Sequence, residues 1–153
     1  MTFDPSKYKI TASAEYEVTD AEGNVIYLDE SQEKPWTITV ASPGTKKAMK
    51  ALHELKQAQS GDLMNQMRGR KSSKNEASES VLRADYLMKV TESTNAENLV
   101  YEGKSGMDAL RAIYLDPFMA HVASGLETFQ VSMGNFSGAS EKASGNTSVT
   151  SLG

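Results

Sequence analysis

The sequence predicts a single α+β domain, in which an N-terminal antiparallel β-meander is followed by about four helices and a disordered C-terminal tail. Apolar and polar side chains alternate in segments of residues 8–40, which is typical of half-buried strands. In residues 43–136 apolar side chains recur at intervals of three and four, which is typical of amphipathic helices. Residues 137–153 are mainly small and polar, and they bury too little apolar surface to offset the entropy lost on ordering. We therefore expect one domain over residues 1–136 and a disordered tail over 137–153.

Three strands are expected in the N-terminal part. Residues 8–18 separate into an apolar and a polar face. A turn follows at Gly23 and Asn24, which tolerate positive φ, and residues 25–28 return as the second strand of a hairpin. Residues 36–40 form the third strand, and the proline before them is tolerated at a first strand position.

The first long helix is expected to begin at Ser42 and Pro43. Serine is a good N-cap, and proline at the first helical position loses no hydrogen bond. Gly61 is a weak point or a break in this helix. The apolar positions that share its inner face are Ala48, Met49, Ala51, Leu52, Leu55 and Ala58.

The middle of the chain is expected to hold a flexible basic loop and a second helix. Residues 69–75 are glycine, basic residues, serine and asparagine, and Asn75 can cap a helix over residues 76–90. Apolar residues recur in that helix with the 3.6-residue period of an α-helix. Residues 99–101 are either a short strand or a packed loop.

Two further helices are expected near the C-terminus. Ser105 caps the first, residues 106–115, with Met107 among its inward positions, and Asp116 ends it. Pro117 cannot continue a helix but suits the start of the next one, whose apolar stripe extends to Met133. The expected core residues of these two helices are Leu110, Phe118, Val122, Leu126 and Phe129.

The net charge of −4 is unevenly distributed along the 153 residues. Residues 46–74 hold eight bases and two acids and carry +6, so the remainder carries −10. Such a chain can associate with itself or dock on a charged partner, whereas the alternative interpretation is a solvated helix face with a charged linker. No apolar run is long enough to cross a membrane, the polar N-terminus does not resemble a signal peptide, and there is no cysteine. We therefore expect a soluble cytoplasmic protein.

No residue pattern indicates catalysis, and we expect neither a cofactor nor a metal. His53 and His121 each lie alone on a predicted helix, without a partner at metal-ligand spacing. The segment Gly103-Lys104-Ser105 lacks the upstream glycine of a phosphate-binding loop. We do not expect nucleic acid as a partner, because no aromatic residue lies near the basic loop and the chain is acidic.

Methionines beside the basic loop are the best candidates for binding a partner. Methionine adapts to irregular apolar surfaces, although most methionines in this chain are expected to fill the core. The candidate partner-binding residues are Met64, Met67, Arg68, Arg70 and Lys71.

Three short motifs together resemble the tail assembly chaperones of long-tailed bacteriophages. Ser42-Pro43-Gly44-Thr45 resembles that family's helix start after an aromatic-containing strand. Ile113-Tyr114-Leu115-Asp116-Pro117 resembles its Leu-Tyr-x-Asp-Pro element, and Asn135-Phe136 resembles the pair that ends its last helix. The resemblance covers roughly residues 36–136, whereas the basic loop and residues 99–103 depart from the pattern.

The resemblance implies a non-enzymatic chaperone-like domain that acts in the cytoplasm of the infected or lysogenic host bacterium. Such proteins bind and solubilise the helical tape-measure protein before the tail tube forms around it. Many also occur as a longer, frameshifted form that engages the tail-tube protein, and self-association is expected. The alternatives are a structural tail or neck component of a phage particle and a small nucleic-acid-binding factor.

Overall fold

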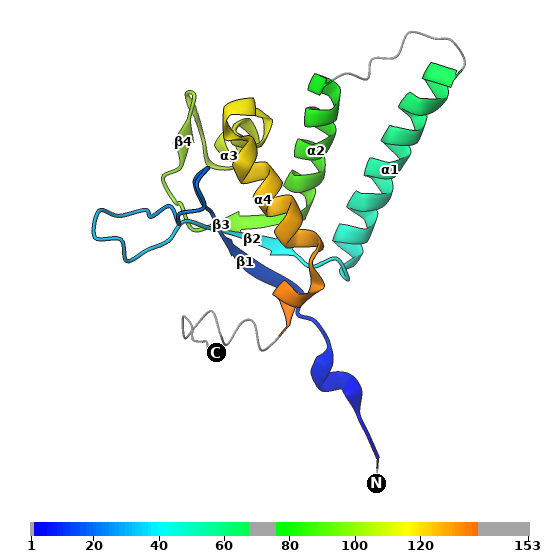
Figure 1. Cartoon of the computed structure of the whole chain (residues 1–153), viewed down its shortest axis with the longest axis horizontal. Helices are drawn as coiled ribbons and strands as arrows, with labels where there is room; N and C mark the ends of the chain where they lie inside the picture. The colour runs from blue at the N-terminus through cyan, green and yellow to red at the C-terminus, as the bar shows by residue number, and fades with distance from the viewer. Residues whose placement is uncertain (1, 68–75, 138–153) are drawn as a thin grey trace.

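The computed structural model describes residues 2–67 and 76–137, except for the side chains of residues 62–66 and 76–78. A three-stranded antiparallel sheet lies at one end, and the helices stand on one of its faces (Figure 1). This arrangement confirms the predicted α+β class. The sheet strands are β1 (Ser13–Glu17), β2 (Thr37–Ala41) and β3 (Thr91–Thr94), and β4 (Val100–Tyr101) pairs separately with β5 (Lys104–Ser105). The α-helices are α1 (Lys46–Met67), α2 (Glu76–Val90), α3 (Gly106–Leu115) and α4 (Ala120–Val131), and the 3-10 turns are η1 (Pro5–Tyr8), η2 (Pro117–Met119) and η3 (Met133–Phe136).

The sheet differs from the predicted meander because residues 91–94, and not residues 25–28, supply one of its three strands. β2 is central, with β1 on one side and β3 on the other. Residues 25–28 form only isolated bridges, because their backbone bonds alternately to Val18 and Trp36 and not along one neighbour: the Ile26 N–H donates to Val18 O, and the Trp36 N–H donates to Ile26 O. The turn before them has positive φ at Gly23, as predicted.

Helix α1 begins three residues later than predicted and does not break at Gly61. Thr45 is its cap, because the Thr45 hydroxyl accepts from the Ala48 N–H at 3.1 Å, while Ser42 lies in the preceding turn. Met49, Leu52 and Ala58 are exposed, which corrects their assignment to the inner face. Among the described elements α1 packs mainly on α2, so only a narrow strip around Ala48 and Ala51 is buried. The bounds of α2 agree with the prediction.

The joint between α3 and α4 contains the largest error in the predicted core. Leu110, Val122 and Leu126 are fully buried, whereas Phe118 is 89% exposed. Pro117 begins a 3-10 turn and not the α-helix itself, so the apolar period counted from α4 does not extend back to Phe118. Met107 and Met133, also predicted to face inward, are exposed.

The C-terminal end of α4 closes the core over the sheet. The Phe129 ring, which is partly buried, packs on Tyr16 at 5.2 Å and on the fully buried Phe136 at 5.8 Å between ring centroids. Gln130 is fully buried as well: its amide nitrogen donates to Ala41 O at 3.1 Å, and its amide oxygen accepts from the Tyr86 hydroxyl at 2.6 Å. This side chain therefore ties α4 to both α2 and β2.

The predicted tail, residues 137–153, falls outside the described residues from 138 onward. Ser137 is the last described residue, and it forms an antiparallel bridge with Ile10. The last described residue therefore lies beside the segment that leads into β1, next to the sheet.

Candidate partner-binding surfaces

Two of the five predicted partner-binding residues, Met64 and Met67, belong to the end of α1 that lies farthest from the sheet (Figure 1). Met67 is the last residue of α1 and is 77% exposed. Met64 lies on the last turn of the same helix, and its side chain is outside the described part. Arg68, Arg70 and Lys71 lie outside the described residues.

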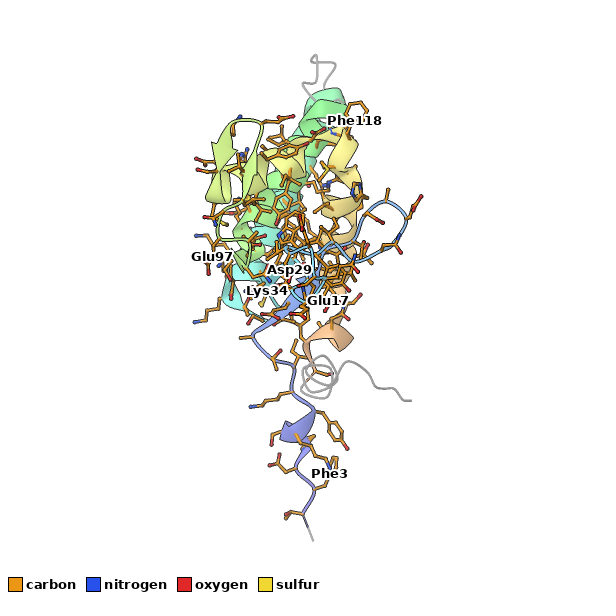
Figure 2. All side chains as sticks on the ribbon, turned by 90° about the vertical axis from the view of Figure 1, so that its left-hand side faces the viewer. Phe3, Glu17, Asp29, Lys34, Glu97 and Phe118 are labelled. Carbon is orange, nitrogen blue, oxygen red and sulfur yellow. The ribbon has the colours of Figure 1, made fainter. Side chains whose placement is uncertain are left out.

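Phe118 adds a second exposed apolar side chain at the same end of the helices. Figure 2 places it at the opposite end of the molecule from Phe3, and Figure 1 shows α2 between the start of α4 and the end of α1. An 89% exposed phenylalanine leaves most of a large apolar surface in water, and this is unfavourable unless a partner covers it. Met67 and Phe118 together are called the helical end below.

Hydrogen bonds around Asp116 hold Phe118 in its outward position. One carboxylate oxygen of Asp116 accepts from the Phe118 N–H at 2.9 Å, and the other accepts from the Tyr101 hydroxyl of β4. The hydrogen bond from Tyr101 and that from the Phe118 backbone lower the pKa of Asp116. The same bond to Asp116 raises the pKa of Tyr101 to about 12, so the donor and the acceptor keep these roles across the neutral range. The β4–β5 hairpin therefore braces the turn that presents Phe118.

A groove with a volume of about 1370 Å³ lies away from the helical end. Its floor includes Glu15 and Glu17 of β1 and Thr37 and Thr39 of β2, which alternate with the inward-facing Tyr16 and Ile38 of the same strands. Its walls come from two loops that are far apart in the sequence and contribute Leu28, Asp29, Glu33, Lys34, Asn95, Glu97 and Val100.

Local hydrogen bonds fix both walls of the groove. On one side, Asp29 accepts from the Ser31 hydroxyl at 2.6 Å and from the N–H groups of Glu33 and Lys34, each at 3.1 Å. These hydrogen bonds, of which the one from Ser31 has the largest effect, lower the pKa of Asp29. Asp29 is therefore ionised at neutral pH. On the other side, the Asn95 amide accepts from the Thr37 N–H and donates to Pro35 O, each at 2.8 Å.

The charge of the groove is strongly negative. Five carboxylates line it, against a single base, Lys34. Figure 2 shows four of the six charged groups, Glu17, Asp29, Lys34 and Glu97, around the middle of the face that it presents. Within the described residues, none of the five acids takes part in a salt bridge. This excess of acids produces a negative potential, and the groove is called the acidic groove below.

The first turns of α1 present the opposite charge on the opposite side of the molecule, at the right of Figure 1. Positions 46, 49, 50 and 56 fall on one face at helical spacing, turned away from α2, with position 52 at its flank. These side chains are exposed and are called the α1 ridge: Lys46, Met49, Lys50, Leu52 and Lys56. Glu54, the acid nearest to them, instead pairs with Lys89 of α2 at 2.8 Å.

Neither surface contains a cluster suited to a metal. Within residues 2–67 and 76–137, no group of three or more His, Asp or Glu side chains could hold an ion. His53 lies on α1 and His121 on α4, as predicted. No helix in the described part is long and apolar enough to cross a membrane. Lys104 and Ser105 form a short strand that leads into α3, so they do not belong to a phosphate-binding loop.

Sequence reasoning missed the acidic groove and placed Phe118 in the core. The excess of acids outside residues 46–74 was a signal for the groove, although charge alone could not show which acids gather. The aspartate-proline pair before Phe118 was a signal for the turn that exposes it.

No family model, curated protein or solved structure matches the chain.

Proposed function

We propose that this chain is a tail assembly chaperone of a long-tailed bacteriophage, which binds and solubilises the helical tape-measure protein in the host cytoplasm. The motif resemblance supports the family, and the exposure of the helical end is the observation that carries the binding role. An extended helical partner offers rows of apolar side chains, and a chaperone must cover them without chemistry. Met67 is adaptable and Phe118 is a large rigid anchor, a combination suited to such rows.

The resemblance motifs have structural roles that agree with this proposal. Asp116 and Pro117 shape the turn that presents Phe118. Asn135 donates to Phe129 O at 2.9 Å and so satisfies a carbonyl at the end of α4, while Phe136 closes the core. The first motif therefore shapes the helical end, whereas the second closes the core at the opposite end of α4, beside the sheet.

The experiment is co-expression with the long helical protein encoded beside this one, followed by affinity capture. We expect a soluble complex with the wild-type chain and a reduced yield with Phe118→Ala. Phe3→Ala is a matched control, because Phe3 is 76% exposed and lies at the opposite end of the molecule (Figure 2). Equal recovery with both variants would remove the helical end from the proposal, and no complex at all with the wild-type chain would reject the chaperone function.

A longer form made by ribosomal frameshifting, which would engage the tail-tube protein, belongs to the same proposal. Its test is the coding DNA, which should contain a slippery site and an overlapping downstream frame. Copies of the chain retained in purified virions would instead favour a structural tail or neck component.

A further inference from the structure

We infer that copies of this chain bind one another head to tail, with the α1 ridge of one copy seated in the acidic groove of the next. The ridge offers Lys46, Lys50 and Lys56. The groove offers five carboxylates, with Glu15 and Glu17 at its floor. This inference concerns other surfaces than the helical end and does not rest on the proposed function.

The two surfaces are complementary in their apolar side chains and also in their charges. Met49 and Leu52 stand exposed among the lysines of the ridge. Leu28 and Val100 are exposed on the walls of the groove. An apolar centre with charges around it is the usual anatomy of a specific protein interface. The match favours a second copy over a purely polycationic partner.

One lysine of the ridge, Lys46, lies at an unfavourable position for the helix that carries it. Lys46 and Lys47 occupy the first turn of α1, which contains no acid. The positive end of the helix dipole lies there, so bases in this turn destabilise the helix slightly. The position of Lys46 is better explained by an external partner than by the stability of α1.

One copy cannot satisfy both surfaces by itself. The acidic groove lies on the side presented in Figure 2, whereas α1 stands at the far side of the molecule, at the right of Figure 1. The two surfaces are different, so the contact is heterologous and leaves a free ridge and a free groove on every pair. Association therefore continues into rings or open chains and does not stop at a dimer.

The test uses sedimentation velocity on the full chain in about 50 mM salt, where exposed charges act over more than 10 Å. We expect the wild-type chain to form concentration-dependent species above the 16.6 kDa monomer and to dissociate in about 0.5 M salt. The groove variant Glu15→Lys/Glu17→Lys and the ridge variant Lys46→Glu/Lys50→Glu should each weaken association by about tenfold or more.

Mixing the two variants tests whether the ridge and the groove contact each other. Each variant alone has lost its contacts, but a mixture keeps the ridge of the groove variant and the groove of the ridge variant. The lysines introduced by Glu15→Lys/Glu17→Lys also face the acids introduced by Lys46→Glu/Lys50→Glu, so the second kind of contact in the mixture is attractive too, and the mixture should regain species larger than a dimer. The matched controls are Glu22→Lys/Glu102→Lys and Lys9→Glu/Lys104→Glu, which make the same charge changes outside both surfaces and should associate like wild type.

Three results would overturn the inference: a wild-type chain that stays monomeric in low salt, variants that associate normally, or a mixture that regains no association. Far-UV circular dichroism of each variant excludes misfolding as a cause. The ridge variant places acids at the start of α1, where they stabilise the helix, so loss of its association cannot be assigned to a weaker helix. Failure here would leave tape-measure capture by the helical end intact, and the reverse also holds.

Discussion

Replacing Gln130 by leucine tests whether the buried amide holds the helices on the sheet. Leucine is close to glutamine in size but makes no hydrogen bond. The substitution removes the donor to Ala41 O and the acceptor of the Tyr86 hydroxyl, and it leaves both partner groups buried. These two groups belong to β2 and α2, so the substitution removes one hydrogen bond between α4 and each of these two elements.

The expected loss of stability follows from the two buried polar groups that no longer have a hydrogen-bond partner. A buried polar group without a partner costs about 1–3 kcal/mol, so two such groups cost about 2–6 kcal/mol, and the added apolar burial of leucine offsets part of this. The whole domain is expected to be stable by only about 5–15 kcal/mol. Gln130→Leu should therefore lower the free energy of unfolding by about 2–5 kcal/mol.

The assay is urea unfolding followed by tryptophan fluorescence. Trp36 is the only tryptophan, is nearly fully buried, and reports on the start of the central strand β2. Tyr86→Phe should cost about 1–2 kcal/mol in the wild-type chain, because it removes one buried hydrogen bond. In the Gln130→Leu background it should cost almost nothing or should stabilise, because it removes a hydroxyl that has already lost its acceptor.

Two outcomes would refute this reasoning. A loss below about 0.5 kcal/mol for Gln130→Leu would show that water or a rearrangement satisfies both partners. Strictly additive effects of the two substitutions would show that the amide and the hydroxyl do not depend on each other.

Three further predictions concern close packing, the two C-terminal phenylalanines and alkaline pH. Gly125→Ala should cost about 1–3 kcal/mol, because the new methyl group overlaps the Tyr16 hydroxyl, and adding Tyr16→Phe should recover most of the loss in a thermal melt. Phe136→Ala should cost about 3–5 kcal/mol in urea unfolding. Phe118→Ala should cost less than about 0.5 kcal/mol, and a larger loss would show that the ring is buried. Burial raises the pKa of Tyr114 above its ordinary value of 10.0, so the folded state keeps a proton that the unfolded chain releases. Stability should therefore be fully present below pH 10.0 and fall as pH rises above it, and a melt series of Tyr114→Phe should show a smaller fall.

The helices were predictable where their periods are long and uninterrupted. The bounds of α2 follow from one apolar period with good helix formers between its apolar positions. The same method failed at Phe118, because the period of α4 was extended across a proline into a turn with different geometry. It also failed for Met49 and Leu52, since a helix at the margin of a domain buries a narrower strip than its apolar pattern suggests.

The third sheet strand could not be recognised from local sequence. Residues 91–94 are Thr-Glu-Ser-Thr, without apolar alternation, and they follow α2 without a turn signal. They form a strand because β2 has a free edge there and because the Thr94 hydroxyl bonds to Thr37 O at 2.8 Å and accepts from the Trp36 indole N–H at 2.9 Å. The acidic groove was beyond sequence reasoning for a related reason: its walls are separated by more than 60 residues and meet only after β3 has joined the sheet.

The bridge between Ile10 and Ser137 determines where any continuation of the chain departs from the domain. That point lies beside the sheet, whereas Met67 and Phe118 lie at the far end of the helices (Figure 1). An added C-terminal module would thus be anchored a full helix length away from the surface proposed to hold the tape-measure protein, about 30 Å for a helix of the size of α1. Such a module could bind a second partner without blocking the surface that binds the first. The folded domain would then hold the two partners apart.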